Sequence, residues 1–180
     1  NTYTDGKGVI TFDKDLTQLG NQAFQNCWYI TSMTLPESLV SIGAQAFTSC
    51  YDMTYIHIPD NVTSIGNDAF YGCLKLNDLT LPKGLTSLGE RVLGQCEGLT
   101  EICVPSGIST LSNSTFQYCK NLSSVSLPEN LTSIGEFAFN GCSSLISITI
   151  PDSVTSIGEL AFTGCTNLQE FNNINASSDK

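Results

Sequence analysis

The sequence predicts an α/β repeat fold: a right-handed solenoid of about seven units, with a parallel sheet of short strands on one face and short helical segments on the other. Three observations carry this prediction. Every proline, seven of the eight cysteines and a recurring Ala-Phe pair follow a 23-residue period without insertion or deletion. A fixed period of this length indicates a repeat architecture. The prolines are Pro36, Pro59, Pro82, Pro105, Pro128 and Pro151, and the cysteines are Cys27, Cys50, Cys73, Cys96, Cys119, Cys142 and Cys165.

The strand of each unit is clearest at Leu145, Ile148 and Ile150, where apolar residues end in the period-two alternation of a short strand. Pro151 then ends the strand, because proline has no N–H to donate to a neighbouring strand. Seven such strands are visible, the first near residues 9–12 and the last in this copy.

The second half of each unit follows a bend that turns Ile157 inward. Around Gly158, the spacing of Ile157, Ala161, Phe162 and Cys165 places them on one face of about two turns of helix. One unit cannot cover its own apolar side, but stacked units can. Neighbouring parallel strands then lie ~4.8 Å apart, and the connections between them should be right-handed.

The pattern L-x-x-I-x-I-P followed by x-x-x-L-T-S-I-G-x-x-A-F-x-G-C resembles the BspA-type leucine-rich repeat over about residues 9–171. The resemblance implies a curved leucine-rich-repeat solenoid. That family consists largely of surface proteins of anaerobic bacteria, with suggested roles in adhesion and binding, and it has no shared catalytic residues to carry over. The chain departs from the repeat at Val92 and Leu93, which replace Ala-Phe, and at Ser112 and Thr115, which replace Gly and Ala. We therefore expect altered packing in the fourth and fifth units.

The chain divides into three segments by its pattern. Residues 1–8 are polar and do not match the repeat, so we expect a cap or a linker there. Residues 9–171 form the solenoid, and residues 172–180 form a polar C-terminal tail. We expect the whole to be a fragment of a longer surface protein, with a self-contained domain as the alternative.

The charge of the chain excludes several function classes. Seven Lys and Arg stand against seventeen Asp and Glu, which gives a net charge of −10. Nucleic-acid binding is therefore not expected, because phosphate contacts need a basic face. Anionic membrane surfaces are disfavoured for the same reason. No run of about eighteen apolar residues occurs, so no segment is expected to insert into a membrane.

The cysteines invite a disulfide interpretation, but their pattern favours free thiols. Seven stand at repeat-specific core positions, where a free cysteine behaves as a small hydrophobe, although the spacing alone does not exclude pairing. The eighth, Cys103, should point outward from the sheet, in the slot that His57 occupies two units earlier. Two units correspond to ~10 Å, too far for a nucleophile and its base. We expect no metal, no cofactor and no enzyme activity.

Opposite charges recur at the repeat interval and should stabilise correct stacking. The remaining acids include like-charged neighbours in adjacent units, among them Asp78 and Glu101, which would form an acidic edge. A solvated face, a weak Ca²⁺ site and a basic partner are the three interpretations of that edge. The five opposite pairs are Lys14/Glu37, Asp52/Lys75, Asp60/Lys83, Asp68/Arg91 and Glu97/Lys120.

Aromatic residues outside the core positions indicate a candidate binding site in the N-terminal half. Trp28 and Tyr51 stand at equivalent positions of successive units, with Tyr29 beside them, and Tyr55 and His57 lie near the next strand. Exposed aromatic stripes are typical of interaction surfaces, although these residues could also support the solenoid.

The sequence favours a monomeric, bacterial cell-surface or secreted adhesion module that binds a protein or glycan. The alternative is a structural spacer or stalk.

Overall fold

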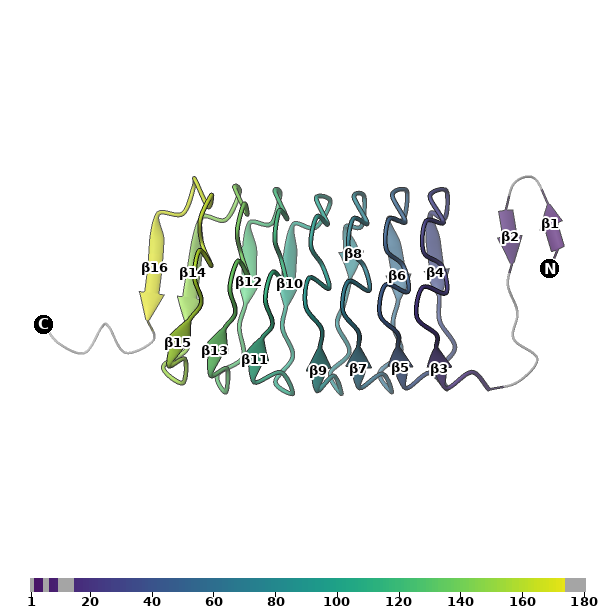
Figure 1. The fold of residues 1–180 in the computed structure, drawn as a ribbon, viewed down its shortest axis with the longest axis horizontal. Coiled ribbons are helices and arrows are strands. Elements are labelled where there is room, and N and C mark those ends of the chain that lie inside the picture. Colours follow the sequence, from purple (N-terminus) through teal and green to yellow (C-terminus); the bar gives the residue numbers. More distant parts are fainter. Residues whose placement is uncertain (1, 5–6, 10–14, 174–180) are drawn as a thin grey trace, which may run out of the picture.

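The computed structural model describes residues 2–4, 7–9 and 15–173 and shows a solenoid of stacked coils (Figure 1). At the N-terminal end, β1 (Thr2–Thr4) and β2 (Lys7–Val9) form an antiparallel hairpin. The first strand expected from the sequence, near residues 9–12, falls mostly outside the described residues. The other strands of the expected sheet are present and parallel.

These strands form one side of the coils, which we call the first sheet row. They pair in parallel at a constant offset of 23 residues, so that Met33 lies opposite Ile56 and Ile102 lies opposite Val125. The last strand follows the seven units counted in the sequence and had not been expected. The row comprises β4 (Ser32–Thr34), β6 (Tyr55–His57), β8 (Asp78–Leu79), β10 (Glu101–Cys103), β12 (Ser124–Ser126), β14 (Ser147–Ile150) and β16 (Glu170–Asn173).

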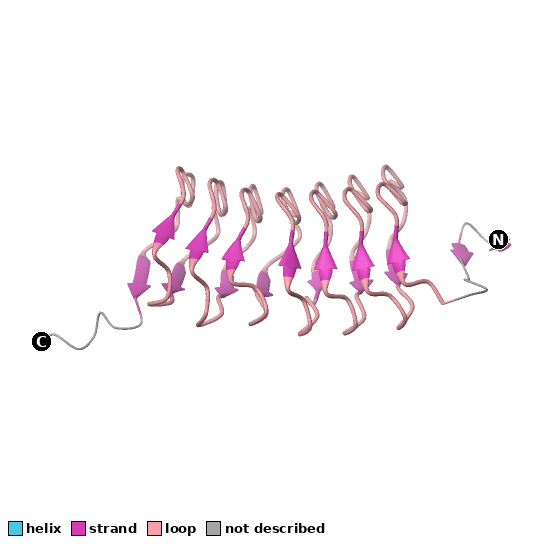
Figure 2. Cartoon of the chain, turned by 60° about the horizontal axis from the view of Figure 1, so that its bottom comes forward, coloured by secondary structure: helices cyan, strands magenta, loops and turns pink. Residues whose placement is uncertain are grey.

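A second sheet row stands where the sequence predicts only a bend. Two-residue strands, mostly Ser-Ile, pair in parallel with the same offset, as Ile42 does with Ile65 (Figure 2). They are too short to show an alternation in the sequence. The row comprises β3 (Gln18–Leu19), β5 (Ser41–Ile42), β7 (Ser64–Ile65), β9 (Ser87–Leu88), β11 (Thr110–Leu111), β13 (Ser133–Ile134) and β15 (Ser156–Ile157).

The third side of each coil is a run of turns, residues 20–27 and their equivalents at 23-residue intervals, which we call the turn wall. The described residues contain no helix, so the prediction of short helical segments is wrong, and none of them could cross a membrane as a helix. Phe24 donates its backbone N–H to Ala46 of the next coil at 2.7 Å, whereas Gln25 donates to Gln22 at 3.1 Å. This alternation repeats along the wall and replaces the i→i−4 bonds of a helix.

The turn wall also requires backbone angles that a right-handed helix lacks. Two residues of each segment, four apart, have a positive φ, such as Gln22 at 59° and Asn26 at 61°. Left-handed residues cannot continue a right-handed helix. Most of the inward positions predicted from the helical spacing nevertheless hold, since Ala138, Phe139 and Cys142 are all fully buried. In the last coil, however, Ile157 is 44% exposed rather than facing inward as predicted, because no second-row strand follows it in the described part of the chain.

The core is a single apolar column that the three sides enclose. Its centre is a stack of phenylalanine rings whose centroids lie 5.2 to 5.3 Å apart in neighbouring coils. Leu93 interrupts the stack, because it stands where the other units carry phenylalanine. The stacked rings belong to Phe24, Phe47 and Phe70 on one side of Leu93 and to Phe116, Phe139 and Phe162 on the other.

Both sheet rows are interrupted between the fourth unit (residues 77–99) and the fifth (residues 100–122). No hydrogen-bonded pairing joins β8 to β10 or β9 to β11, although the turn wall continues across, with Leu93 donating to Thr115 at 3.0 Å. A further gap separates β12 from β14 in the first row alone. The altered packing expected for the fourth and fifth units is therefore confirmed.

The interruption of the second row follows from Ser112. At the equivalent glycines the coils touch so closely that an added Cβ would lie 2.6 Å from a backbone nitrogen at Gly66 and 2.4 Å at Gly89. Ser112 carries that Cβ, so its backbone must lie farther from the preceding coil. Its hydroxyl donates to the Leu88 carbonyl at 2.7 Å, whereas Gly89 donates its backbone N–H to Ile65 at 2.9 Å.

Candidate functional site

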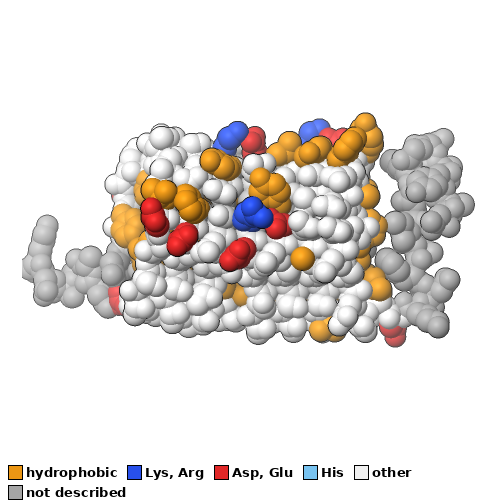
Figure 3. Space-filling model, viewed as in Figure 1, with side chains coloured by type: hydrophobic (Ala, Val, Ile, Leu, Met, Phe, Trp, Pro, Cys, Tyr) orange, Lys and Arg blue, Asp and Glu red, His pale blue; other side chains and the backbone are white. Residues whose placement is uncertain are grey.

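The loops before β4 and β6 carry an exposed aromatic pair. Trp28 and Tyr51 stack with ring centroids 6.3 Å apart and an interplanar angle of 17°. Trp28 is 49% exposed, Tyr51 is 40% exposed, and Leu74 follows at the equivalent position of the next unit. Figure 3 shows hydrophobic side chains along this upper edge of the molecule. We call Trp28, Tyr51 and Leu74 the aromatic edge.

A polar row runs beside the aromatic edge. It begins with Tyr29, which is 83% exposed, and continues with Asp52 and Lys75, whose carboxylate and ammonium lie 2.6 Å apart. The Asp52 backbone N–H donates to the Trp28 carbonyl at 3.1 Å, so the two loops are held in register. The edge therefore joins flat apolar surface to a hydroxyl and to both signs of charge.

The other two predicted site residues lie on the first sheet row. Tyr55 begins β6 and His57 ends it, on the same outward face of the strand. His57 Nε2 lies 3.2 Å from a Glu37 carboxylate oxygen. No aromatic stacking joins Tyr55 to the aromatic edge in the part of the chain that the structure describes. The five predicted residues thus fall into two groups, one on the loops and one on the sheet.

Three of the five predicted charge pairs are confirmed. Besides Asp52 with Lys75, Arg91 lies 2.9 Å from Asp68 and Lys120 lies 2.7 Å from Glu97. The pairing of Lys83 with Asp60 is wrong, since no ion pair joins them. Lys14 lies outside the described residues, and its expected partner Glu37 contacts His57 instead.

The cysteine prediction is confirmed in its main points. All eight thiols are free; five of the core cysteines are buried, the terminal Cys27 and Cys165 are half-buried, and Cys103 is exposed. Each core thiol from the second onward donates to a backbone carbonyl of the preceding coil, as Cys119 does to Leu93 at 3.1 Å. Burial raises the pKa of the Cys96 thiol well above its usual range and that of Cys119 to about 12. These thiols are therefore protonated and inward-facing at neutral pH.

The predicted acidic edge lies at one end of the interrupted sheet. Asp78 begins β8 and Glu101 begins β10, and both are exposed. Asp78 pairs with Tyr55 of the preceding strand, whereas β8 and β10 do not pair. No group of three or more His, Cys, Asp or Glu among residues 2–4, 7–9 and 15–173 is arranged to hold a metal ion.

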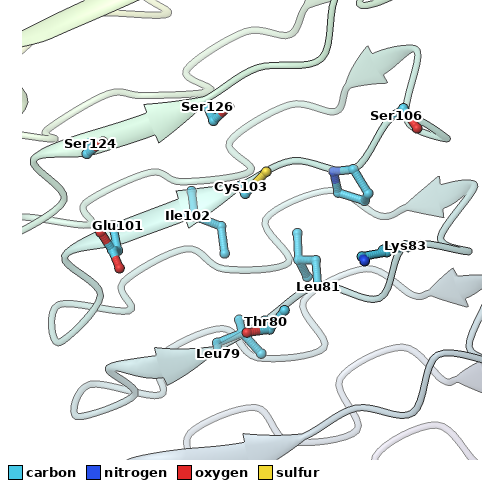
Figure 4. A pocket seen from close by; sticks show the side chains of 11 residues that line it. Leu79, Thr80, Leu81, Lys83, Glu101, Ile102, Cys103, Ser106, Ser124 and Ser126 are labelled. Atoms are coloured by element: carbon cyan, nitrogen blue, oxygen red, sulfur yellow. The ribbon is translucent and has the colours of Figure 1, made fainter.

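Sequence reasoning missed a groove that opens where β8 and β10 separate. It has a volume of about 580 Å³. Leu79, Leu81 and Ile102 form its floor, and Figure 4 shows Cys103 in its middle. Glu101 and Lys83 stand at opposite ends of the groove in that view. The signal in the sequence was the replacement of glycine by Ser112, which marks the junction but not the side on which a groove forms.

Several solved bacterial proteins are similar to this chain in fold. A leucine-rich-repeat protein from Bacteroides ovatus is 32% identical, with a TM-score of 0.85 over 90% of this chain and 43% of its own. A leucine rich cell surface protein from Faecalibacterium prausnitzii is 33% identical, with a TM-score of 0.83 over 90% of this chain and 44% of its own. The leucine-rich-repeat protein of T. pallidum is 29% identical, with a TM-score of 0.81 over 86% of this chain and 72% of its own.

This chain therefore spans less than half the length of the first two relatives. No protein with a curated description is significantly similar to it. The family model of the BspA type leucine rich repeat region matches residues 7–123 and 40–169, in six copies. Together with the 23-residue coils and their parallel strands, this match shows that the chain belongs to the BspA-type leucine-rich-repeat family.

Proposed function

We propose that the chain is a non-enzymatic binding module, displayed at a bacterial cell surface or secreted, and that the aromatic edge binds a protein or glycan partner. The observation that carries the proposal is the stacked, half-exposed pair of Trp28 and Tyr51. Rigid aromatic side chains give contact area at little cost in conformational entropy, and Trp and Tyr are enriched at binding hot spots. The F. prausnitzii relative is a leucine rich cell surface protein, which supports this location.

The geometry of the edge suits a partner with both flat apolar and polar groups. Trp28 and Tyr51 offer a continuous apolar face across two coils, and Leu74 extends it to a third. Sugar rings and aromatic or aliphatic side chains can pack on such a face, while Tyr29 and the Asp52–Lys75 pair offer hydrogen bonds beside it. A catalytic role has no support here, because the single histidine contacts Glu37 and stands two units away from the exposed thiol.

The test uses Trp28 as its own reporter, since it is the only tryptophan in the chain. The purified chain is titrated with a panel of extracellular-matrix proteins and oligosaccharides, and Trp28 fluorescence is followed. A ligand of the aromatic edge should change the emission. Tyr51→Ala should weaken its binding by about 1–3 kcal/mol.

Tyr118→Ala is the matched control, because Tyr118 is 43% exposed on the turn wall of the other half of the molecule. This substitution should leave the affinity unchanged. Equal losses from both tyrosine substitutions would contradict a site at the aromatic edge. If Tyr51→Ala leaves the affinity unchanged and the double variant Asp78→Asn/Glu101→Gln abolishes binding, the site is on the acidic edge instead.

The alternative function is a structural spacer or stalk, in which the coils supply length and another segment binds. The many small Ser and Thr side chains on the outward face of the first row, such as Ser32, Thr34, Ser124 and Ser126, favour this alternative. A panel in which this chain binds nothing, while a longer protein that contains it does bind, would support the spacer.

A further inference from the structure

The groove lies over β8 and β10 and reaches Ser124 and Ser126 of β12, and it contains two strand edges that have no partner strand. β8 is the last strand of a three-stranded sheet and β10 is the first of a two-stranded sheet, and no backbone hydrogen bond joins them. In every regular junction of this row the facing N–H and C=O groups bond to each other. Between β8 and β10 these bonds are absent, so the facing edges of both strands have no partner strand. Edge strands with free backbone groups are templates for pairing with another polypeptide.

The two coils are close at both ends of the groove and apart only between those ends. At Gly98 an added Cβ would lie 2.7 Å from the Lys75 carbonyl carbon, and at Gly107 it would lie 2.2 Å from the Leu85 oxygen. Glycine is therefore needed at both positions. The opening between these contacts runs along residues 79–83 and 101–106, which corresponds to about 17–20 Å of extended chain, or five to six residues.

The lining chemistry is polarised along the groove. Leu79, Leu81 and Ile102 supply an apolar floor, and exposed hydroxyl groups, such as that of Thr80, line the rim. One end carries the exposed carboxylate of Glu101, and the exposed Asp78 begins β8 just before the lining residues. The other end carries the ammonium of Lys83, which makes no ion pair in the described part of the chain.

We propose that this groove binds an extended polypeptide segment of a partner protein, by pairing with the free edge of β8 or β10. The segment places alternate apolar side chains on the floor, a basic residue against Asp78 and Glu101, and an acidic residue near Lys83. This site is separate from the aromatic edge and does not depend on it. The volume of about 580 Å³ is within the range of sites that hold small ligands or short peptide segments.

A peptide is favoured over a glycan by the kind of group that the groove leaves unsatisfied. The facing edges of β8 and β10 have no partner strand, and such an edge pairs with another backbone in strand conformation, as in β-strand addition. A floor of three aliphatic side chains offers a sugar no aromatic face. Alternation along an extended chain would direct every second side chain into the groove, which fits a floor of aliphatic residues between charged ends.

Cys103 provides the assay, because it is the exposed thiol and stands in the groove. The probe is the capped heptapeptide Lys-Thr-Val-Thr-Val-Thr-Glu, in which lysine, both valines and glutamate share one side of the extended chain. The rate of Cys103 alkylation by iodoacetamide is followed by peptide mapping as the probe is added. Binding should slow this rate in a saturable way, while the rate at half-buried Cys165 stays unchanged.

Two controls separate strand pairing and charge matching from mere covering of the thiol. The same peptide with N-methyl groups along one edge should bind about tenfold more weakly, since it loses backbone hydrogen bonds. The same peptide with glutamate at both ends should bind about three- to tenfold more weakly. Glu101→Lys should reverse that preference without changing the stability of the protein.

The proposal is overturned if the heptapeptide gives no saturable protection of Cys103, or if the N-methylated peptide protects equally well. Protection by a neutral oligosaccharide at the same concentration would also overturn it, because it would show a glycan groove. None of these outcomes bears on the aromatic edge, whose reporter is Trp28.

Discussion

The junctions on the two sides of β9 differ in one small group and have different structures. Towards β7, Gly89 allows the coils to touch, and β9 pairs with β7 in register. Towards β11, Ser112 stands in place of glycine, its hydroxyl replaces the backbone N–H as donor to Leu88, and pairing is lost. Stacking in this solenoid therefore depends on the absence of a Cβ at one position of each unit, as well as on its apolar core.

Substitutions in the core should show the largest difference in unfolding free energy between regular and interrupted junctions. Phe47 is fully buried and stacks on rings of both neighbouring coils. We expect Phe47→Ala to lower the free energy of unfolding by about 3–5 kcal/mol, because the rigid stack cannot close the cavity. Leu93→Ala should cost less, about 2–3 kcal/mol, since the interrupted sheets beside it can relax. Urea denaturation measures both; equal costs would show that the interrupted junction is as rigid as the others.

A serine placed in a regular junction should reproduce the interruption. In Gly66→Ser the new Cβ would meet the Ala44 backbone nitrogen, which an added Cβ approaches to 2.6 Å. We expect a loss of about 1–3 kcal/mol, as for other overpacked sites, and faster amide hydrogen exchange in β5 and β7.

The reverse change, Ser112→Gly, is the matched control. It should slow amide exchange of Leu88 and Thr110, because β9 and β11 can then pair. If exchange at these two residues is unaffected, Ser112 accompanies the interruption without causing it.

The turn wall continues unchanged across the interruption, so its buried thiols should make stability depend on pH in the same way on both sides. Burial raises the pKa of Cys119 to about 12, whereas an unfolded cysteine titrates near 8.5. The folded state therefore keeps a proton that the unfolded state loses, and stability present below about pH 8.5 is lost as the pH rises towards 12. For one thiol the loss is about 1.4 kcal/mol per pH unit.

Urea denaturation between pH 9 and 10.5 tests this expectation. In Cys119→Ala the fall of stability with pH should be shallower than in the parent chain by about 1.4 kcal/mol per pH unit. Identical slopes would mean that the thiol next to the interruption is hydrated enough to ionise in the folded state.

Removing a surface charge should give the smallest difference in stability between a regular junction and the interrupted one. Lys75 pairs with Asp52 at 2.6 Å, whereas Lys83 beside the groove makes no ion pair among the described residues. Lys75→Met should cost at most about 1 kcal/mol, and Lys83→Met should be close to neutral. A larger cost at Lys83, measured in the same denaturant series, would indicate that the ammonium stabilises the separated strands.

The 23-residue period predicted most of the architecture, because each unit places its side chains in the same slots. The buried cysteines, the outward Cys103 and three cross-coil ion pairs all follow from adding 23 to a residue number. The prediction of a helix was wrong for a physical reason. The spacing of Ala138, Phe139 and Cys142 fits one face of a helix, but alternate backbone N–H groups bond to the next coil instead of to the preceding turn.

The candidate sites were predictable to different degrees. The stacking of Trp28 on Tyr51 could be expected from equivalent positions in adjacent units. The groove could not, because it depends on the loss of pairing between β8 and β10 and on backbone contacts at Gly98 and Gly107 that close its ends. A single sequence shows that glycine is present at such positions but not which backbone atom approaches it.

The turn wall that continues past Ser112 has a mechanical consequence. When the chain is pulled from its ends, every junction carries the same load. Regular junctions share it among backbone hydrogen bonds on all three sides. The junction after β9 has backbone hydrogen bonds only along the turn wall, where Arg91 donates to Asn113 at 3.0 Å and Leu93 to Thr115 at 3.0 Å. Bonds along one side of a joint rupture one after another. Under tension this protein should therefore yield first between its fourth and fifth units and leave two blocks still folded.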